Sequence, residues 1–192
     1  MAWRDLIHLG DLPLTLAAAA AIVAWTLAAR AWRLAFWWSV AFTLAMGLVA
    51  ATKIAFIVWG AGSPALGFRA LSGHATGATL VAVMCLNLYF GRKAGPVRLV
   101  GIVAGLVLGA AMGFVLVLYD EHSIAEAAAG WAVGGLAAMA AIKLAAESPP
   151  PIPPLTAFGV VIVFFSTVVL LRPLPIAYLM WRAARMIARH TV

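Results

Sequence analysis

The chain of 192 residues is 66% hydrophobic and only 10% charged, and its mean hydropathy is +1.07. These values exclude an ordinary soluble domain and predict an integral membrane protein. The net charge of +7 comes from Arg and Lys at the ends of apolar runs. There they set topology and contact anionic headgroups, so we do not expect nucleic-acid binding. The single cysteine, Cys85, excludes an intramolecular disulfide and a cysteine metal cluster.

The apolar segments predict an all-α polytopic bundle of about six membrane-spanning helices. In chain order they cover residues 12–31, 34–59, 72–90, 99–118, 122–146 and 155–171. The first segment shows no small-residue cleavage pattern after a basic start, so we interpret it as a retained helix rather than a signal peptide. We therefore expect a single transmembrane domain over residues 1–192.

The C-terminal part, residues 147–192, adds a segment beyond the fifth helix. It begins with a proline-rich break that no helix continues through. Its tail predicts an interfacial amphipathic helix, because arginines at helical spacing lie beside apolar residues: Leu179, Met180, Trp181, Arg182, Arg185 and Arg189. This segment could form a dimer contact, a lid over the site or a lipid sensor, and the sequence leaves these alternatives open.

Positive charges in the turns predict the orientation. The turn at Arg30 and Arg33 and the turn at Arg92, Lys93 and Arg98 lie on one side by helix counting. The positive-inside rule makes that side cytoplasmic, so the loop after the second helix and both histidine-bearing helix starts face outward. The same helix counting places the arginine-rich tail on the outer side, which disagrees with the positive-inside rule. The tryptophans are predicted to be interfacial anchors, among them Trp37, Trp38, Trp59 and Trp181.

Ser72-Gly73-His74 forms the predicted start of the third helix. A helix N-terminus offers unpaired backbone N–H groups and the positive end of the helix dipole, so it suits a phosphate. Histidine can donate or accept a proton near neutral pH. An interfacial helix cap without a ligand is the alternative for His74.

His122 and Glu126 are four residues apart, so their side chains are expected to lie on one helix face and to meet. A carboxylate that accepts from one imidazole nitrogen fixes the tautomer and raises the basicity of the other nitrogen. A purely structural pair is the alternative. Ser123 is interpreted as a helix cap. Lys53 lies near the outer end of the second helix, where it either serves a site or extends its ammonium group to the interface.

Three short elements, in this order, resemble the signature motifs of the type 2 phosphatidic acid phosphatase superfamily: Lys53, Ser72-Gly73-His74, and His122 through Glu126 with Gly130 a turn later. The superfamily includes membrane phosphatases of lipid phosphates and prenyl diphosphates, soluble acid phosphatases and vanadium haloperoxidases. Leu9-Gly10-Asp11 is similar to a stretch often found in bacterial members. The resemblance covers residues 9–146, which we expect to form a phosphatase-like core.

Several positions depart from the family pattern. Gly60 stands where the first motif has arginine-proline, and Leu71 stands in place of the proline of the second motif. Val115 and Leu116 replace the serine-arginine that opens the third motif. Two phosphate-binding arginines are therefore missing, and Arg69 is the candidate to substitute for one of them.

The resemblance implies an enzyme that hydrolyses a phosphomonoester or diphosphate of a lipid without a metal or another cofactor. His122 would be the nucleophile that forms a phosphohistidine, Glu126 its orienter, and His74 the general acid and base. Lys53, Ser72, Gly73 and Arg69 would bind the substrate phosphate. Candidate substrates are undecaprenyl diphosphate, phosphatidic acid, phosphatidylglycerophosphate and a lipid A phosphate.

We expect the protein in a bacterial inner membrane, with its active site facing the periplasm. Phosphotransfer to an acceptor other than water uses the same residues and stays open. A catalytically silent member that binds lipid phosphate or assists lipid transport is the competing hypothesis, and the missing arginines favour it. A small-solute transporter is a third alternative, against which stands the lack of an inverted repeat with broken helices.

Overall fold

The computed structural model describes residues 7–8, 10–90, 96–146, 153–171 and 176–191. Within these ranges it contains seven α-helices: α1 (Leu12–Ala28), α2 (Trp32–Trp59), α3 (Gly73–Phe90), α4 (Pro96–Leu118), α5 (Ile124–Ala145), α6 (Pro154–Leu171) and α7 (Ile176–Thr191). A short 3-10 helix, η2 (Pro64–Leu66), interrupts the loop between α2 and α3. The predicted all-α bundle is confirmed. Leu9, the charges Arg92 and Lys93, and residues 147–152 lie outside the described ranges.

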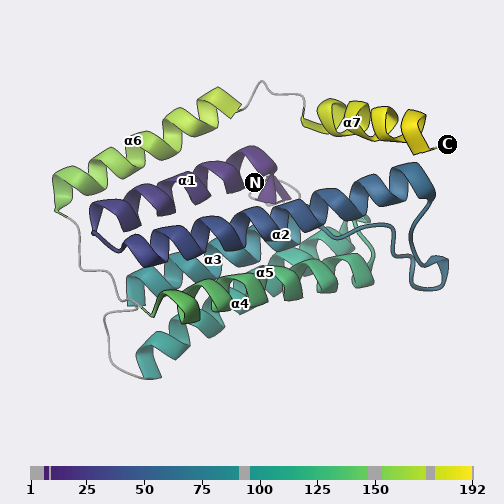
Figure 1. Ribbon diagram of the computed structural model, residues 1–192. Coiled ribbons are helices and arrows are strands. Elements are labelled where there is room, and N and C mark those ends of the chain that lie inside the picture. Colours follow the sequence, from purple (N-terminus) through teal and green to yellow (C-terminus); the bar gives the residue numbers. More distant parts are fainter. Residues whose placement is uncertain (1–6, 9, 91–95, 147–152, 172–175, 192) are drawn as a thin grey trace.

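Helices α1 to α5 run alternately up and down, with α6 beside α1 and α7 packed against α2 (Figure 1). Helix α3 is central, because it contacts α1, α2, α4 and α5. Four of the helices, α2 to α5, are long and apolar enough to cross a membrane, and α1 and α6 are shorter apolar helices. The chain is therefore a multi-pass membrane protein.

Local sequence signals explain where the helices begin and end. α4 begins at Pro96, earlier than expected, because proline is well suited to the first helical turn. α2 ends at Gly60, whose φ of 65° is a left-handed conformation that glycine adopts at little cost. α5 begins at Ile124 rather than at His122, because Ser123 caps it as expected. The positions of these helix ends determine which residues lie in the loops of the bundle.

Helix α4 packs closely against α3 through glycines spaced four residues apart. A Cβ atom on Gly105 would lie 2.5 Å from Cα of Val83, and one on Gly101 would lie 2.9 Å from the Phe90 ring. A Cβ on Gly109 would overlap Thr79. Small residues at such positions let helix backbones touch in lipid, where association depends on packing and hydrogen bonds.

Trp38 is a correction to the predicted set of interfacial tryptophans. It is fully buried in the core, where its Nε1 donates a hydrogen bond to the carbonyl of Ala19 at 3.2 Å. Trp59 and Trp181 are exposed, as an interfacial anchor requires. Position along the sequence could not separate the inward-facing Trp38 from its neighbours, because apolar residues occur on every side of α2.

Candidate active site

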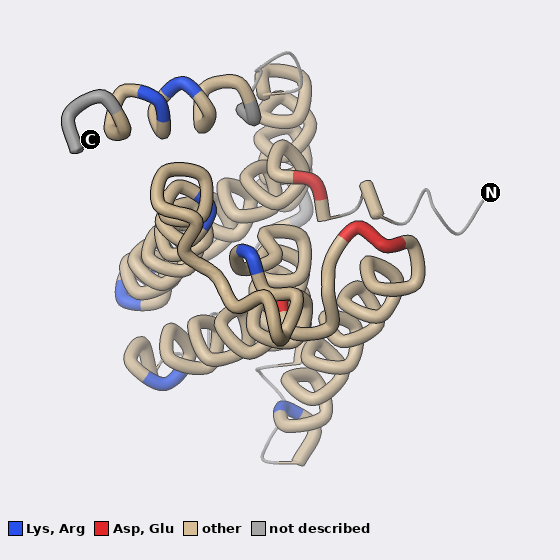
Figure 2. Tube along the Cα trace, turned by 90° about the vertical axis from the view of Figure 1, so that its right-hand side faces the viewer, with Lys and Arg blue, Asp and Glu red and all other residues tan. Residues whose placement is uncertain are grey.

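One end of the bundle collects the polar side chains that the sequence singled out. Helices α1, α3 and α5 begin there and α2 and α4 end there, because the helices alternate in direction (Figure 1). Figure 2 looks along the bundle and shows how few acidic and basic residues the bundle carries. His74 and His122 both lie at this end, and the centroids of their rings are 6.4 Å apart. The two histidine-bearing helix starts, predicted to face the same side, therefore lie at the same end of the bundle.

His122 and Glu126 form a close pair at the start of α5. Nδ1 of His122 donates a hydrogen bond to Oε2 of Glu126 at 2.8 Å. Because His122 precedes the cap residue Ser123, the pair is brought together by the capping turn rather than along a regular helix face. Glu126 completes a capping box, since Oγ of Ser123 accepts from its N–H and its Oε2 accepts from the Ser123 N–H.

Glu126 also holds the loop that leads into α3. Its Oε1 accepts hydrogen bonds from the backbone N–H of Arg69 at 2.8 Å and of Ala70 at 3.3 Å. Its own carbonyl accepts from the N–H of Ser72 at 3.3 Å. The Glu126 side chain is 8% exposed, so it is a buried carboxylate satisfied by several donors. One residue thus orients His122 and fixes the loop that positions His74.

A second carboxylate–histidine pair involves Asp11, which the sequence analysis did not assign to the site. Nε2 of His74 donates to Oδ1 of Asp11 at 2.9 Å, and Nδ1 of the exposed His8 donates to Oδ2 at 3.0 Å. Gly10 permits this approach, because a Cβ there would lie 2.9 Å from Cβ of His74. The signal that could have found Asp11 is its place immediately before α1, a helix that begins at the site end.

Gly130 lets α5 approach the start of α3. A Cβ atom on Gly130 would lie 2.6 Å from the carbonyl oxygen of Ser72. The two helices therefore approach each other backbone to backbone where α3 begins. This contact sets the depth at which α3 begins relative to α5.

A cavity of about 490 Å³ opens beside His74. Lys53, on α2, lines it together with Gly73 and His74 at the start of α3. Lys53 is partly buried and interacts electrostatically with Glu126. The neighbouring Thr52 accepts a hydrogen bond from the N–H of Leu71 at 3.2 Å, which ties α2 to the same loop. The cavity thus combines a cation, a histidine and the first turn of a helix.

Two residues predicted to bind phosphate are not brought to this cavity. Ser72 is fully buried, and its Oγ caps α3 by accepting from the N–H of Ala75 at 3.3 Å. Arg69 is exposed and lines a different hollow of about 300 Å³, formed with the loop after α2. Its contribution to the site is its backbone N–H, which binds Glu126.

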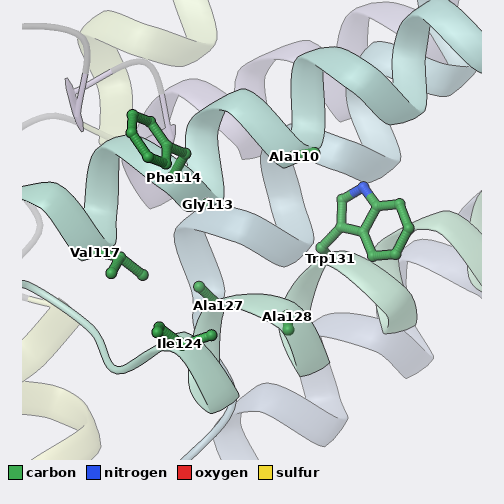
Figure 3. A pocket seen from close by; sticks show the side chains of 8 residues that line it. All are labelled: Ala110, Gly113, Phe114, Val117, Ile124, Ala127, Ala128 and Trp131. Atoms are coloured by element: carbon green, nitrogen blue, oxygen red, sulfur yellow. The ribbon is translucent and has the colours of Figure 1, made fainter.

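A further hollow, of about 420 Å³, lies between α4 and α5. Figure 3 shows its lining, which consists of Ala, Gly and apolar side chains that include Phe114, Ile124 and Trp131. None of its lining residues carries a charge, so it lacks a cation that could bind a phosphate. Among the residues that the structure describes, no group of three or more His, Cys, Asp or Glu side chains is arranged to hold a metal ion.

The fold and the site define a multi-pass all-α membrane protein with two carboxylate-paired histidines at one end of its bundle. The chain is 29% identical over 152 residues to an uncharacterized 22.5 kDa protein in the cps region of Klebsiella pneumoniae. The aligned part covers 79% of this chain and 73% of that protein. No family model matches the chain, and no solved structure matches it.

Proposed function

We propose that the protein is a membrane lipid phosphatase that works through a phosphohistidine. The observation that carries this proposal is the pair of histidines, each hydrogen-bonded to its own carboxylate, whose rings lie 6.4 Å apart. His74 lines the cavity that Lys53 also lines, and His122 lies next to His74 but is not part of that lining. A lipid-phosphate binder needs cations and N–H donors but no oriented nucleophile. The order of motifs that resembles the type 2 phosphatidic acid phosphatases supports the same reading.

His122 is assigned as the nucleophile. Its Nδ1–H is held by Glu126, which leaves the lone pair of Nε2 free to attack phosphorus. A bond forms between Nε2 and phosphorus while the bond from phosphorus to the leaving oxygen breaks. Glu126 stabilises the positive charge that develops on the ring, as the carboxylate of a catalytic triad does.

His74 is assigned as the general acid and base. Asp11 accepts from Nε2–H, so Nδ1 is the nitrogen that exchanges a proton with the substrate. It protonates the leaving oxygen in the first step. In the second step it accepts a proton from the water that attacks the phosphohistidine, and inorganic phosphate leaves. Such proton transfer typically contributes ~10²–10⁴-fold to rate.

Lys53 and the first turn of α3 are assigned to the phosphoryl oxygens. The N–H groups of Gly73 and His74 lie in the first turn of the helix, where no intrahelical acceptor is available to them. Together with the Lys53 ammonium group they offer charge stabilisation where negative charge accumulates. No metal enters this scheme.

The substrate is assigned to the lipid phosphates, namely a prenyl diphosphate, phosphatidic acid, phosphatidylglycerophosphate or a lipid A phosphate. A bilayer-embedded bundle meets such molecules with the headgroup at the interface and the chain in the membrane. The basic turns predict that the site end faces away from the cytoplasm, which places the reaction on the periplasmic side of a bacterial inner membrane.

The test is phosphate release by purified protein from each of these lipids, with excess chelator and with His122→Ala in parallel. Release from one lipid by the wild-type protein, lost in a folded His122→Ala variant, is the expected result. Equal release by His122→Ala would overturn the assignment of the nucleophile. Adding a lipid alcohol as acceptor distinguishes hydrolysis from phosphotransfer, because transfer gives a new phosphorylated lipid in place of inorganic phosphate.

A second candidate function is a catalytically silent protein that binds lipid phosphate. The observation that favours it is the position of Arg69, whose side chain lines a hollow separate from the one that Lys53 lines. No guanidinium group lines the Lys53 cavity in the part of the chain that the structure describes. Saturable binding of these lipids with no turnover of any of them would select this candidate.

A further inference from the structure

Helix α7 reaches the cavity from the C-terminal end of the chain. It packs against α2, and Leu179 and Met180 line the same cavity as Lys53 and His74. The fully buried Ala184 lies four residues after Met180 on the same side of the helix. The C-terminal segment is therefore a wall of the candidate site and not a separate appendage.

The lining of the cavity is polar in one part and apolar in the rest. Lys53 and His74 supply the polar groups, whereas most of the remaining side chains are apolar, including Met46, Val49 and Ile54 of α2. A cavity of about 490 Å³ lies within the usual size range of small-molecule sites. A lining with one cation and a long apolar part matches an amphiphile that has an anionic head.

The outer face of α7 is basic. Arg182 and Arg185 are exposed, and the guanidinium carbon of Arg185 lies 3.4 Å from the centroid of the Trp181 ring. A helix with arginines on one face and apolar residues on the other is typical of helices that lie in the headgroup region of a membrane. α7 thus has exposed arginines that can contact anionic headgroups, and it also supplies two residues of the cavity wall.

We propose that Leu179 and Met180 of α7 hold the apolar chain of a lipid whose phosphate lies at Lys53 and His74. The proposal rests on the proposed function for the location of the phosphate and adds the element that recognises the lipid chain. Two contacts then define the ligand: an ammonium group for the anionic head and an α7 wall for the first part of the chain. A water-soluble phosphate ester uses the first contact alone.

The test places a fluorescent bimane group on Met180→Cys in a Cys85→Ala, His122→Ala background, which keeps the probe lipid intact. The protein is placed in phosphatidylcholine nanodiscs that contain a small fraction of phosphatidic acid with brominated chains. The matched control labels Met186→Cys, an exposed position on the same helix that does not line the cavity. Brominated phosphatidylcholine at the same mole fraction measures the background from bulk lipid.

The expected result is quenching at position 180 that exceeds the phosphatidylcholine background by about twofold, because a bound lipid raises the local bromine concentration. Lys53→Met removes this excess, and position 186 shows none. Leu179→Cys serves as a second reporter if the label at position 180 displaces the lipid. Absence of an excess at both reporters, or an excess that survives Lys53→Met, overturns the proposal.

Phosphate release by the wild-type protein from the same phosphatidic acid is measured separately. Excess quenching without phosphate release supports the role of α7 in binding the lipid chain and overturns the hydrolysis of this lipid. Release without excess quenching keeps the hydrolase and overturns the role of α7. The two proposals therefore fail through different measurements.

Discussion

Oδ1 of Asp11 accepts a hydrogen bond from Nε2 of His74 at 2.9 Å, although 63 positions separate the two residues in the chain. This bond fixes the tautomer of His74 and leaves Nδ1 as the nitrogen that the proposed reaction uses. Glu126 does the opposite for His122, since it engages Nδ1 and leaves Nε2. The two rings are thus held by different nitrogens, in agreement with different roles in the proposed reaction.

Asp11→Asn is expected to lower kcat for phosphate release by about 10- to 100-fold, less than the ~10²–10⁴-fold that loss of the acid–base group itself costs. KM is expected to change little, because Asp11 acts through His74 rather than on the substrate. His8→Gln is the control, since exposed His8 binds the other oxygen of the same carboxylate. Steady-state kinetics of the three proteins provide the check, and a rise in KM at constant kcat would contradict the role.

Glu126→Ala and Glu126→Gln are expected to separate folding from chemistry. Alanine leaves the N–H groups of Arg69 and Ala70 without their acceptor, which costs about 1–3 kcal/mol for each group that stays buried. Glutamine keeps one carbonyl oxygen for the loop but removes the charge that stabilises the His122 ring. Thermal unfolding in detergent should therefore show a larger loss for Glu126→Ala, while both variants lose phosphatase activity. Equal stability of the two variants would contradict the structural role.

Lys53→Met is expected to weaken inhibition by vanadate or inorganic phosphate by about 10- to 100-fold, because a hydrogen bond to a charged group is worth about 1.5–3 kcal/mol. Lys143→Met is the matched control, since Lys143 is an exposed lysine near the other end of α5. Inhibition constants measured for both variants decide the matter. An unchanged inhibition constant in Lys53→Met would favour the alternative that this lysine only extends its ammonium group to the membrane interface.

Gly130→Ala is expected to destabilise the protein by about 1–3 kcal/mol through overpacking. Its Cβ would lie 2.6 Å from the Ser72 carbonyl, and neither α3 nor α5 can yield without moving a histidine. Gly47→Ala is the control, because nothing lies within 4 Å of a Cβ at that helical position. Unfolding temperatures in detergent compare the two, and equal values would show that the helices can separate freely.

The sequence predicted much of the fold because each spanning helix needs a long apolar run between polar turns. It also predicted the His122–Glu126 contact, since both residues lie within one turn of chain. It missed the partnership of Asp11 with His74, because only the packing of α1 on α3 brings these distant residues together. Ser72 is predicted to bind phosphate from its place in a motif, yet its hydroxyl caps α3. The sequence does not show that Ser72 is buried, and burial is what keeps its hydroxyl away from the cavity.

The sequence left a contact of the C-terminal segment with the site as one alternative among several, for a different reason. An amphipathic helix can rest anywhere along the membrane surface, and its periodicity shows which face is apolar without showing what that face touches. Arg69 is a similar case. Its place three residues before Ser72 suggested a ligand, but the path of the loop directs its backbone N–H toward Glu126 and exposes its side chain.

The glycines of α4 restrict the paths by which the proposed lipid substrate can reach the cavity. Because Gly101, Gly105 and Gly109 bring α4 into backbone contact with α3, an acyl or prenyl chain cannot pass between these two helices. The cavity is instead bounded by α2, α3, α7, Gly10 and the start of α1. Under the proposed function, a lipid that diffuses within the membrane plane reaches the cavity on the flank of α2 and α7, and bulky residues introduced on that flank are expected to slow its entry without changing the proposed chemistry at His122.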